Sequence, residues 1–96
     1  MDLLEKVKDR IRADGTAMDS DIQDTIDACI LDLELNGIQK SKISDADALI
    51  IRAIKTYCIA EYSSDDKEAG RFKSAYEALR DHLALSIEYT GGGLIG

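Results

Sequence analysis

The stretch that decides the fold runs from residue 72 to residue 87 and reads FKSAYEALRDHLALSI. Five of its apolar residues recur at steps of four, three, four and four: Phe72, Tyr76, Leu79, Leu83 and Ile87. This spacing places them on one face of an α-helix. The sequence therefore predicts one long amphipathic helix, reaching from Asp65 or Asp66 to about Glu88, whose apolar stripe packs against a core.

A glycine-rich segment follows this helix and ends in two aliphatic side chains. Its residues are Gly91, Gly92, Gly93, Leu94, Ile95 and Gly96. We expect a helical domain over residues 1–90 and a flexible tail over residues 91–96. Such a tail orders when a partner offers it a surface, and simple terminal disorder is the alternative.

The composition favours an all-α protein. The chain has 96 residues, of which 45% are hydrophobic, and it contains no proline, so nothing forbids long helices. Its length suits one modest core and therefore one domain. No apolar run approaches the roughly 20 residues that a bilayer span needs, and the N-terminus lacks the layout of a signal peptide. We expect a soluble protein that starts out in the cytosol and has no membrane partner.

Three further helices are expected from the same kind of pattern. The four predicted ranges are residues 2–13, 19–36, 44–62 and 65–88. Asp14-Gly15 and Gly37 are expected to end the first two, with Ile38 folding back on the second, and Ser20 and Gln23 stand at capping-box spacing. The third helix is apolar over most of its circumference, which predicts a compact bundle of about four helices with this one central.

The second helix carries an unusual concentration of negative charge. Seven acidic residues and no lysine or arginine lie in residues 13–36: Asp14, Asp19, Asp21, Asp24, Asp27, Asp32 and Glu34. One interpretation is a solvated face with carboxylates favourably placed near the helix N-terminus. The other is an acidic surface, formed by the six residues from Asp19 onward, that complements a basic partner or repels passing DNA.

The same helix has two apolar sides. Its core stripe is Ile22, Ile26, Cys29, Ile30 and Leu33, whereas Ala28, Leu31 and Leu35 lie on roughly the opposite side. Either another helix covers this second side, or it is a subunit interface. If it is exposed, it indicates assembly.

Signs of catalysis, metal binding or cofactor binding are weak. His82 is the sole histidine and has no spaced carboxylate or cysteine partner, Cys29 and Cys58 read as buried thiols, and no phosphate loop or nucleophile elbow occurs. The aspartates near Asp21 lack the glycine and glutamate of an EF-hand loop. We expect no catalytic residue, no metal site and no cofactor.

The C-terminal half resembles the small head-tail connector, or adaptor, proteins of tailed bacteriophages. Their pattern F-x-x-x-Y-E-x-L-x-x-H-L-x-L-S follows an apolar helix that ends in aromatic and acidic residues. Here it is matched by Phe72, Tyr76, Glu77, Leu79, His82, Leu83, Leu85 and Ser86. The resemblance is strong over residues 45–90, and its motif concerns packing, not catalysis.

The resemblance implies a structural, non-enzymatic protein of the virion neck. Family members form a ring, commonly twelve-fold, that docks on the portal after DNA packaging and joins the capsid to a stopper or tail-completion protein. DNA passes without sequence-specific binding, and assembly takes place in the host cytoplasm. It further implies portal docking by residues 91–96 and a use for the acidic helix, either facing the channel or meeting basic residues such as Lys6, Lys8, Arg10 or Arg12 of a neighbour.

A function of another class is the alternative to the connector hypothesis. A small acidic helical regulator, including a DNA mimic, would bind a basic partner through Asp21, Asp24 and Asp27. The dependence of binding on salt separates the two hypotheses, because screening weakens exposed charge pairs far more than apolar contacts.

Overall fold

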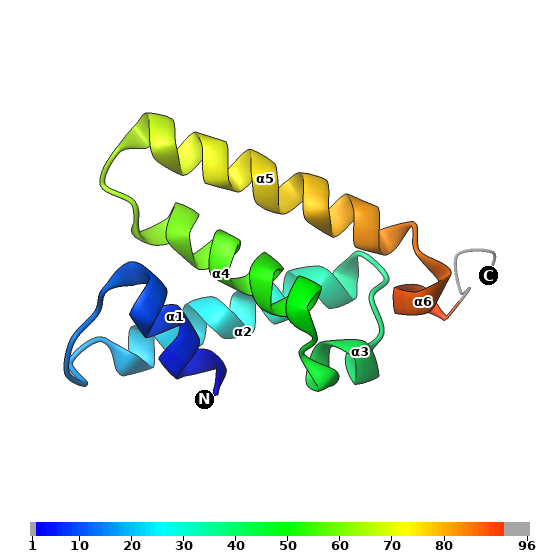
Figure 1. Ribbon diagram of the computed structural model, residues 1–96, viewed down its shortest axis with the longest axis horizontal. Coiled ribbons are helices and arrows are strands. Elements are labelled where there is room, and N and C mark those ends of the chain that lie inside the picture. Colours follow the sequence, from blue (N-terminus) through cyan, green and yellow to red (C-terminus); the bar gives the residue numbers. More distant parts are fainter. Residues whose placement is uncertain (1, 92–96) are drawn as a thin grey trace.

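Six helices make up the part of the chain that the structure, a computed structural model, describes: residues 2–91 (Figure 1). Their bounds are α1 Leu3–Ile11, α2 Asp19–Leu35, α3 Lys40–Asp45, α4 Ala48–Tyr62, α5 Asp66–Ala84 and α6 Ile87–Thr90. No strand occurs among the described residues, so the predicted all-α class is confirmed. The predicted helices correspond to α1, α2, α4 and α5, whereas α3 and α6 were not predicted.

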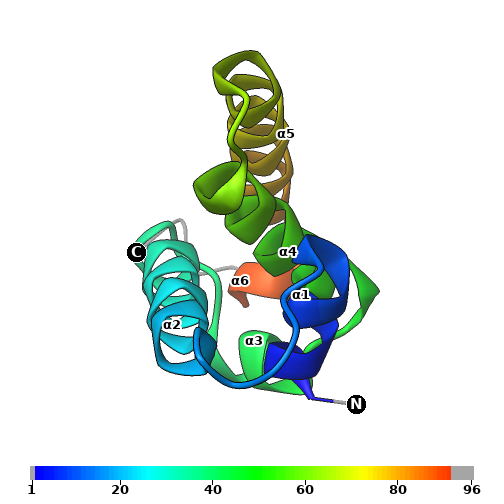
Figure 2. The same cartoon turned by 90° about the vertical axis from the view of Figure 1, so that its left-hand side faces the viewer.

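Helix α4 lies at the centre, as the sequence predicts. It contacts α1, α2 and α5, and Figure 2 shows it between α5 on one side and α1 and α2 on the other. Its buried residues are Ile50, Ala53, Ile54, Cys58 and Ile59. All of these except Ile59 belong to one core with the stripe of α2, which consists of Ile22, Ile26, Cys29 and Leu33.

Helix α5 stands at the edge of the molecule. It packs chiefly along α4 and reaches α6 at its end, and Figure 2 shows it on the far side of α4 from α1. The molecule measures 43 × 29 × 18 Å. The helices thus form a compact all-α arrangement, in which the described residues contain six helices and not the predicted four. One flank of α5 remains open to solvent.

The predicted end of α2 is confirmed in detail. Gly37 takes a positive φ of 96° and donates its N–H to the carbonyl of Glu34, while Ile38 donates to the carbonyl of Leu33 at 3.1 Å. This is the Schellman pattern, which glycine favours because it has no Cβ. Ile38 is buried against the core, so this turn also fixes where the chain leaves α2.

The predicted start of α2 at residue 19 is confirmed, whereas two predicted end signals, the Gly15 stop and the Ser20–Gln23 cap, were wrong. Helix α1 ends at Arg12, which itself adopts the left-handed conformation with φ 59°, so Gly15 lies beyond the end and does not cap it. Helix α2 begins after Met18 without a side-chain cap, and the Ser20–Gln23 box does not form. Lys8 accounts for both differences between the predicted and the observed ends. Its ammonium donates to the Gly15 carbonyl at 2.6 Å and pairs with Asp19 at 2.8 Å, and these contacts hold the loop between α1 and α2.

The third predicted helix begins later than expected, at Ala48, and a short helix that was not predicted precedes it. Residues 40–45 form the short helix α3, which ends at Ala46 in a left-handed conformation. Helix α4 begins only after Asp47, whose carboxylate accepts the backbone N–H groups of Leu49 and Ile50, both at 3.0 Å. The predicted start at residue 44 or 45 was therefore wrong, because Asp47 is the residue that caps the helix.

The helix predicted over residues 65–88, α5, also ends earlier than predicted. Helix α5 stops at Ala84, Ser86 is extended, and the chain turns into α6. Ile87 is consequently 75% exposed and does not belong to the packed stripe, whereas Tyr89 is 6% exposed and enters the core. The turn thus exchanges the burial of Ile87 for that of the larger Tyr89.

Candidate assembly interface

An apolar patch on α2 consists of Ala28, Leu31 and Leu35. Leu31 is 55% exposed, Leu35 is 77% exposed, and Ala28 also faces solvent. No described helix covers them, which removes the alternative that another helix of the same chain packs on this side. Exposed leucines at helical spacing are typical of a surface that a partner covers.

The acidic residues of α2 divide into those used inside the chain and those left free. Asp19 pairs with Lys8, and this hydrogen bond raises the pKa of the Lys8 ammonium. Asp21 accepts a hydrogen bond from the Tyr62 hydroxyl of α4. These two carboxylates therefore hold α2 against α1 and α4. Their roles inside the chain were not predicted from the sequence.

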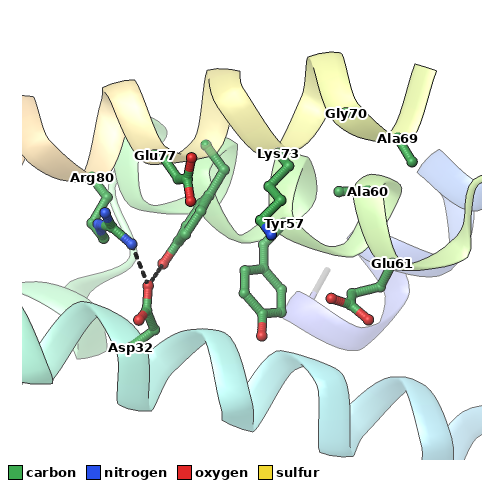
Figure 3. A pocket seen from close by; sticks show the side chains of 10 residues that line it. Asp32, Tyr57, Ala60, Glu61, Ala69, Gly70, Lys73, Glu77 and Arg80 are labelled. Atoms are coloured by element: carbon green, nitrogen blue, oxygen red, sulfur yellow. Dashed lines mark hydrogen bonds and ion pairs between the residues drawn. The ribbon is translucent and has the colours of Figure 1, made fainter. Parts of the chain in front are cut away.

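Asp32 joins α2 to α5. Its carboxylate accepts the Tyr76 hydroxyl at 2.6 Å and the Arg80 guanidinium at 3.2 Å (Figure 3). Burial and this hydrogen bond raise the pKa of Tyr76 well above its usual range, so the phenol stays protonated. Glu34 is half-buried, whereas Asp21, Asp24 and Asp27 are exposed and make no ion pair among residues 2–91. Of these three, Asp24 makes no side-chain hydrogen bond within that range, while Asp27 accepts one from Gln23.

A pocket of about 390 Å³ lies between α4 and α5 and extends to Asp32 of α2. Figure 3 shows Tyr57 among the side chains that line it. The Tyr57 ring packs edge-on against that of Tyr76, with 5.0 Å between the ring centres. A Cβ built at Gly70 would meet nothing within 4 Å, so this glycine does not mark a close helix contact within the described residues. The lining residues are Asp32, Tyr57, Ala60, Glu61, Ala69, Gly70, Lys73, Tyr76, Glu77 and Arg80.

The four motif residues of α5 face the core side of that helix. Tyr76 and Leu83 are buried, whereas Phe72 and Leu79 are partly buried. The Arg10 guanidinium of α1 lies 5.8 Å from the centre of the Phe72 ring, a cation–π distance. These contacts agree with a motif that packs α5 against the rest of the chain.

The C-terminal segment is attached to the molecule by α6. The backbone N–H of Gln39 donates to the Tyr89 carbonyl at 2.9 Å, and the Tyr89 hydroxyl donates to Asp47. Gly91 ends α6 with φ 69°, and a Cβ there would lie 2.3 Å from the Gln39 side chain. Of the six predicted docking residues only Gly91 is described, since residues 92–96 lie outside the described range. Asp47 was not predicted to cap α4, although an aspartate directly before an apolar helical run is a recognisable cap.

Other reactive groups are placed as follows. Cys29 and Cys58 are free and buried, and burial raises the pKa of each thiol to about 12. His82 is exposed on α5.

Among residues 2–91, no group of three His, Cys, Asp or Glu side chains is arranged to hold a metal ion. None of the helices in the same range has the length and apolarity needed to cross a bilayer.

A family model described as phage connector protein matches residues 3–90, nearly the whole chain. The chain belongs to the phage connector protein family. Comparisons with curated proteins and with solved structures return no significant match. The head-tail connector resemblance of the C-terminal half is thereby confirmed, and it extends to the N-terminal half, where the sequence pattern was weaker.

Family membership gives the exposed surfaces a context. Connector proteins are structural components that assemble with other phage head and tail proteins. A connector subunit must therefore present surfaces to partners, and the α2 patch is an exposed apolar surface of that kind.

Proposed function

We propose that this connector forms a ring that docks on the portal after DNA packaging and joins the capsid to the stopper or tail-completion protein in the virion neck. The observation that carries the proposal is the α2 patch, Ala28, Leu31 and Leu35, left uncovered on a chain of this family. Subunits are made in the host cytoplasm and assemble there. A twelve-fold ring, common among head-tail connectors, repeats one modest interface many times and so gains stability by avidity.

The segment from Gly91 to Gly96 is proposed to dock on the portal. Support comes from α6, because Tyr89, Asp47 and Gln39 fix the point at which this segment leaves the molecule. Leu94 and Ile95 then supply apolar side chains for portal pockets, and the glycines let the backbone approach closely.

The ring surrounds passing DNA without reading its sequence. The formal charge of −7 leaves the protein without the basic stripe that grips phosphates. DNA is therefore expected to slide through the connector while the protein contacts hold the neck together.

The test is to mix the purified connector with tail-less portal complexes and to examine the product by electron microscopy and sedimentation. We expect a ring of connector density on the portal. If the protein neither forms rings nor binds portal at any concentration or salt tried, the proposed function is wrong.

A second experiment separates docking from folding. Deletion of Leu94–Gly96 should weaken portal binding while the far-ultraviolet circular dichroism stays unchanged. The doubly substituted chain Leu94→Ser/Ile95→Ser has the full length and serves as the matched variant; it should behave like the deletion. Unfolding of the deleted chain would refute the separate roles given to the domain and the tail.

The acidic regulator remains a second candidate because Asp24 and Asp27 are exposed and carry no ion pair within residues 2–91. It predicts tight binding to a basic protein at low salt that collapses steeply as salt rises. Portal binding that persists at high salt supports the connector function instead.

A further inference from the structure

We propose that neighbouring subunits join through a parallel pair of helices, α2 of one copy against the solvent-exposed flank of α5 of the next. This inference rests on the proposed ring and names the residues that build it. It commits the α2 patch to a second copy of this chain as its occupant.

The first surface, here called the α2 stripe, consists of Asp24, Ala28, Leu31 and Leu35. Steps of four, three and four place these residues on one line along the helix, opposite the buried line of Ile22, Ile26, Cys29 and Leu33. All four are exposed. From the N-terminal to the C-terminal end, the stripe changes from a carboxylate through a methyl group to two aliphatic side chains.

The second surface, the α5 stripe, consists of Lys67, Arg71, Ser74, Ala78 and Leu85. Steps of four, three, four and seven again define one line, and it lies opposite the packed line of Phe72, Tyr76, Leu79 and Leu83. All five residues are exposed, Leu85 to 77%. This stripe changes from two cations through two small side chains to one aliphatic side chain.

The two stripes are complementary when the helices run parallel. Asp24 and Leu31 are seven residues apart, as are Arg71 and Ala78. With Asp24 opposite Arg71, the Leu31 side chain falls on the small residue Ala78, which lets the helices approach closely. Leu35 then lies toward Leu85, about one helical turn along, so the apolar ends meet as well.

The arrangement of the subunit permits this parallel pairing. Helices α2 and α5 run in the same general direction, from left to right in Figure 1, and lie at different edges of the molecule in Figure 2. A neighbour related by a rotation that preserves this direction presents its α5 parallel to the first copy's α2. A two-fold pairing of α2 with α2 would instead place Asp24 against aliphatic side chains.

Two basic residues of α1, Lys8 and Arg10, are already engaged within the chain. Lys8 is already held by Asp19 and the Gly15 carbonyl, and Arg10 lies over Phe72. Lys67 and Arg71, by contrast, make no ion pair within residues 2–91. Because the contact joins two different surfaces, each subunit keeps one of each for its next neighbours, and such head-to-tail contacts close into a ring when the rotation between neighbours divides a full turn.

Charge reversal tests the pairing in the presence of portal complexes. Asp24→Lys or Arg71→Glu alone is expected to raise the connector concentration at half assembly by about tenfold, because like charges then face each other. The double variant Asp24→Lys/Arg71→Glu should restore assembly. The matched controls Asp45→Lys and Arg52→Glu change exposed charges outside both stripes and should assemble like the wild type.

Cross-linking tests the register directly. A mixture of Leu31→Cys and Ala78→Cys chains should form a disulfide-linked dimer on mild oxidation, whereas each variant alone and the wild type, whose own thiols are buried, should yield little. Circular dichroism verifies that each variant is folded. If Asp24→Lys and Arg71→Glu each assemble rings like the wild type, and if the mixture of Leu31→Cys and Ala78→Cys chains forms no disulfide, this interface is wrong. The proposed function would then still stand. Failure of the wild type to assemble would overturn both.

Discussion

Tyr89 and Asp47, 42 residues apart, are joined by a hydrogen bond from the phenol to a carboxylate that also caps α4. One oxygen of Asp47 accepts the N–H groups of Leu49 and Ile50, and the other accepts the Tyr89 hydroxyl. The start of the central helix and the last described helix therefore share one anchor. The placement of α6 and of Gly91, the last described residue, depends on this pair.

Replacing Tyr89 with Phe should lower the free energy of unfolding at pH 7 by about 1 kcal/mol, since one hydrogen bond to a largely exposed carboxylate is lost. Urea denaturation measures the change. The variant Tyr57→Phe is the matched control, because the Tyr57 hydroxyl has no hydrogen-bond partner among the described residues, and it should be nearly neutral.

The same pair predicts a dependence on pH. The Tyr89 hydrogen bond, followed by the N–H of Ile50, holds the pKa of Asp47 below its usual range. Because the folded-state pKa is the lower one, this stabilisation is present above the ordinary Asp pKa of about 3.9 and is lost as pH falls through the folded value. The stability difference between wild type and Tyr89→Phe should therefore shrink on going from pH 7 to pH 3. A difference that stays constant would show that Asp47 is not responsible.

Asp32 and Tyr76 should prove energetically coupled. Tyr76→Phe removes the 2.6 Å hydrogen bond between α5 and α2, and Asp32→Asn removes the charge that also holds Arg80. A double-mutant cycle measured by urea denaturation should give a coupling energy of about 1 kcal/mol. Strict additivity of the two substitutions would mean that this contact contributes nothing to the packing of α5.

The long helices were predictable because their information is local. Periodicity identifies α1, α2, α4 and α5, and the Gly37–Ile38 turn follows from chemistry within six residues. Helices α3 and α6 were not predictable in this way. Whether the chain continues α5 past Ala84 or turns to bury Tyr89 depends on Asp47 and Gln39, which lie far away in sequence.

The candidate interface was only partly predictable for the same reason. The α2 patch is evident from the spacing of Ala28, Leu31 and Leu35, but its exposure depends on where α5 packs. The charge count likewise could not distinguish Asp24, which is free for a partner, from Asp32, which is committed to Tyr76 and Arg80. The assignment of the domain boundary at residue 90 and the role of the segment that follows remain predictions.

The native thiols should be unreactive in the folded protein. Burial raises the pKa of Cys29 and of Cys58 to about 12, so almost no thiolate exists at pH 8 and reagents cannot reach the sulfur. A chromogenic disulfide reagent should titrate both thiols in denaturant and neither within minutes without it. The exposed thiol of Leu31→Cys serves as the positive control. Rapid reaction of the folded wild type would indicate that the core opens around α2 and α4.

Two glycine-to-alanine substitutions should change stability in opposite directions. Gly37 has φ 96° at the end of α2, where a Cβ is strained, so Gly37→Ala should cost about 1 kcal/mol of unfolding free energy. Gly70 lies within α5, and a Cβ there meets open space, so Gly70→Ala should add up to about 1 kcal/mol through helix propensity alone. Thermal and urea denaturation of both variants measure the two effects, and each variant controls for the shared chemical change. Destabilisation by Gly70→Ala would mean that the pocket beside α5 closes in solution and that this glycine is needed for close packing.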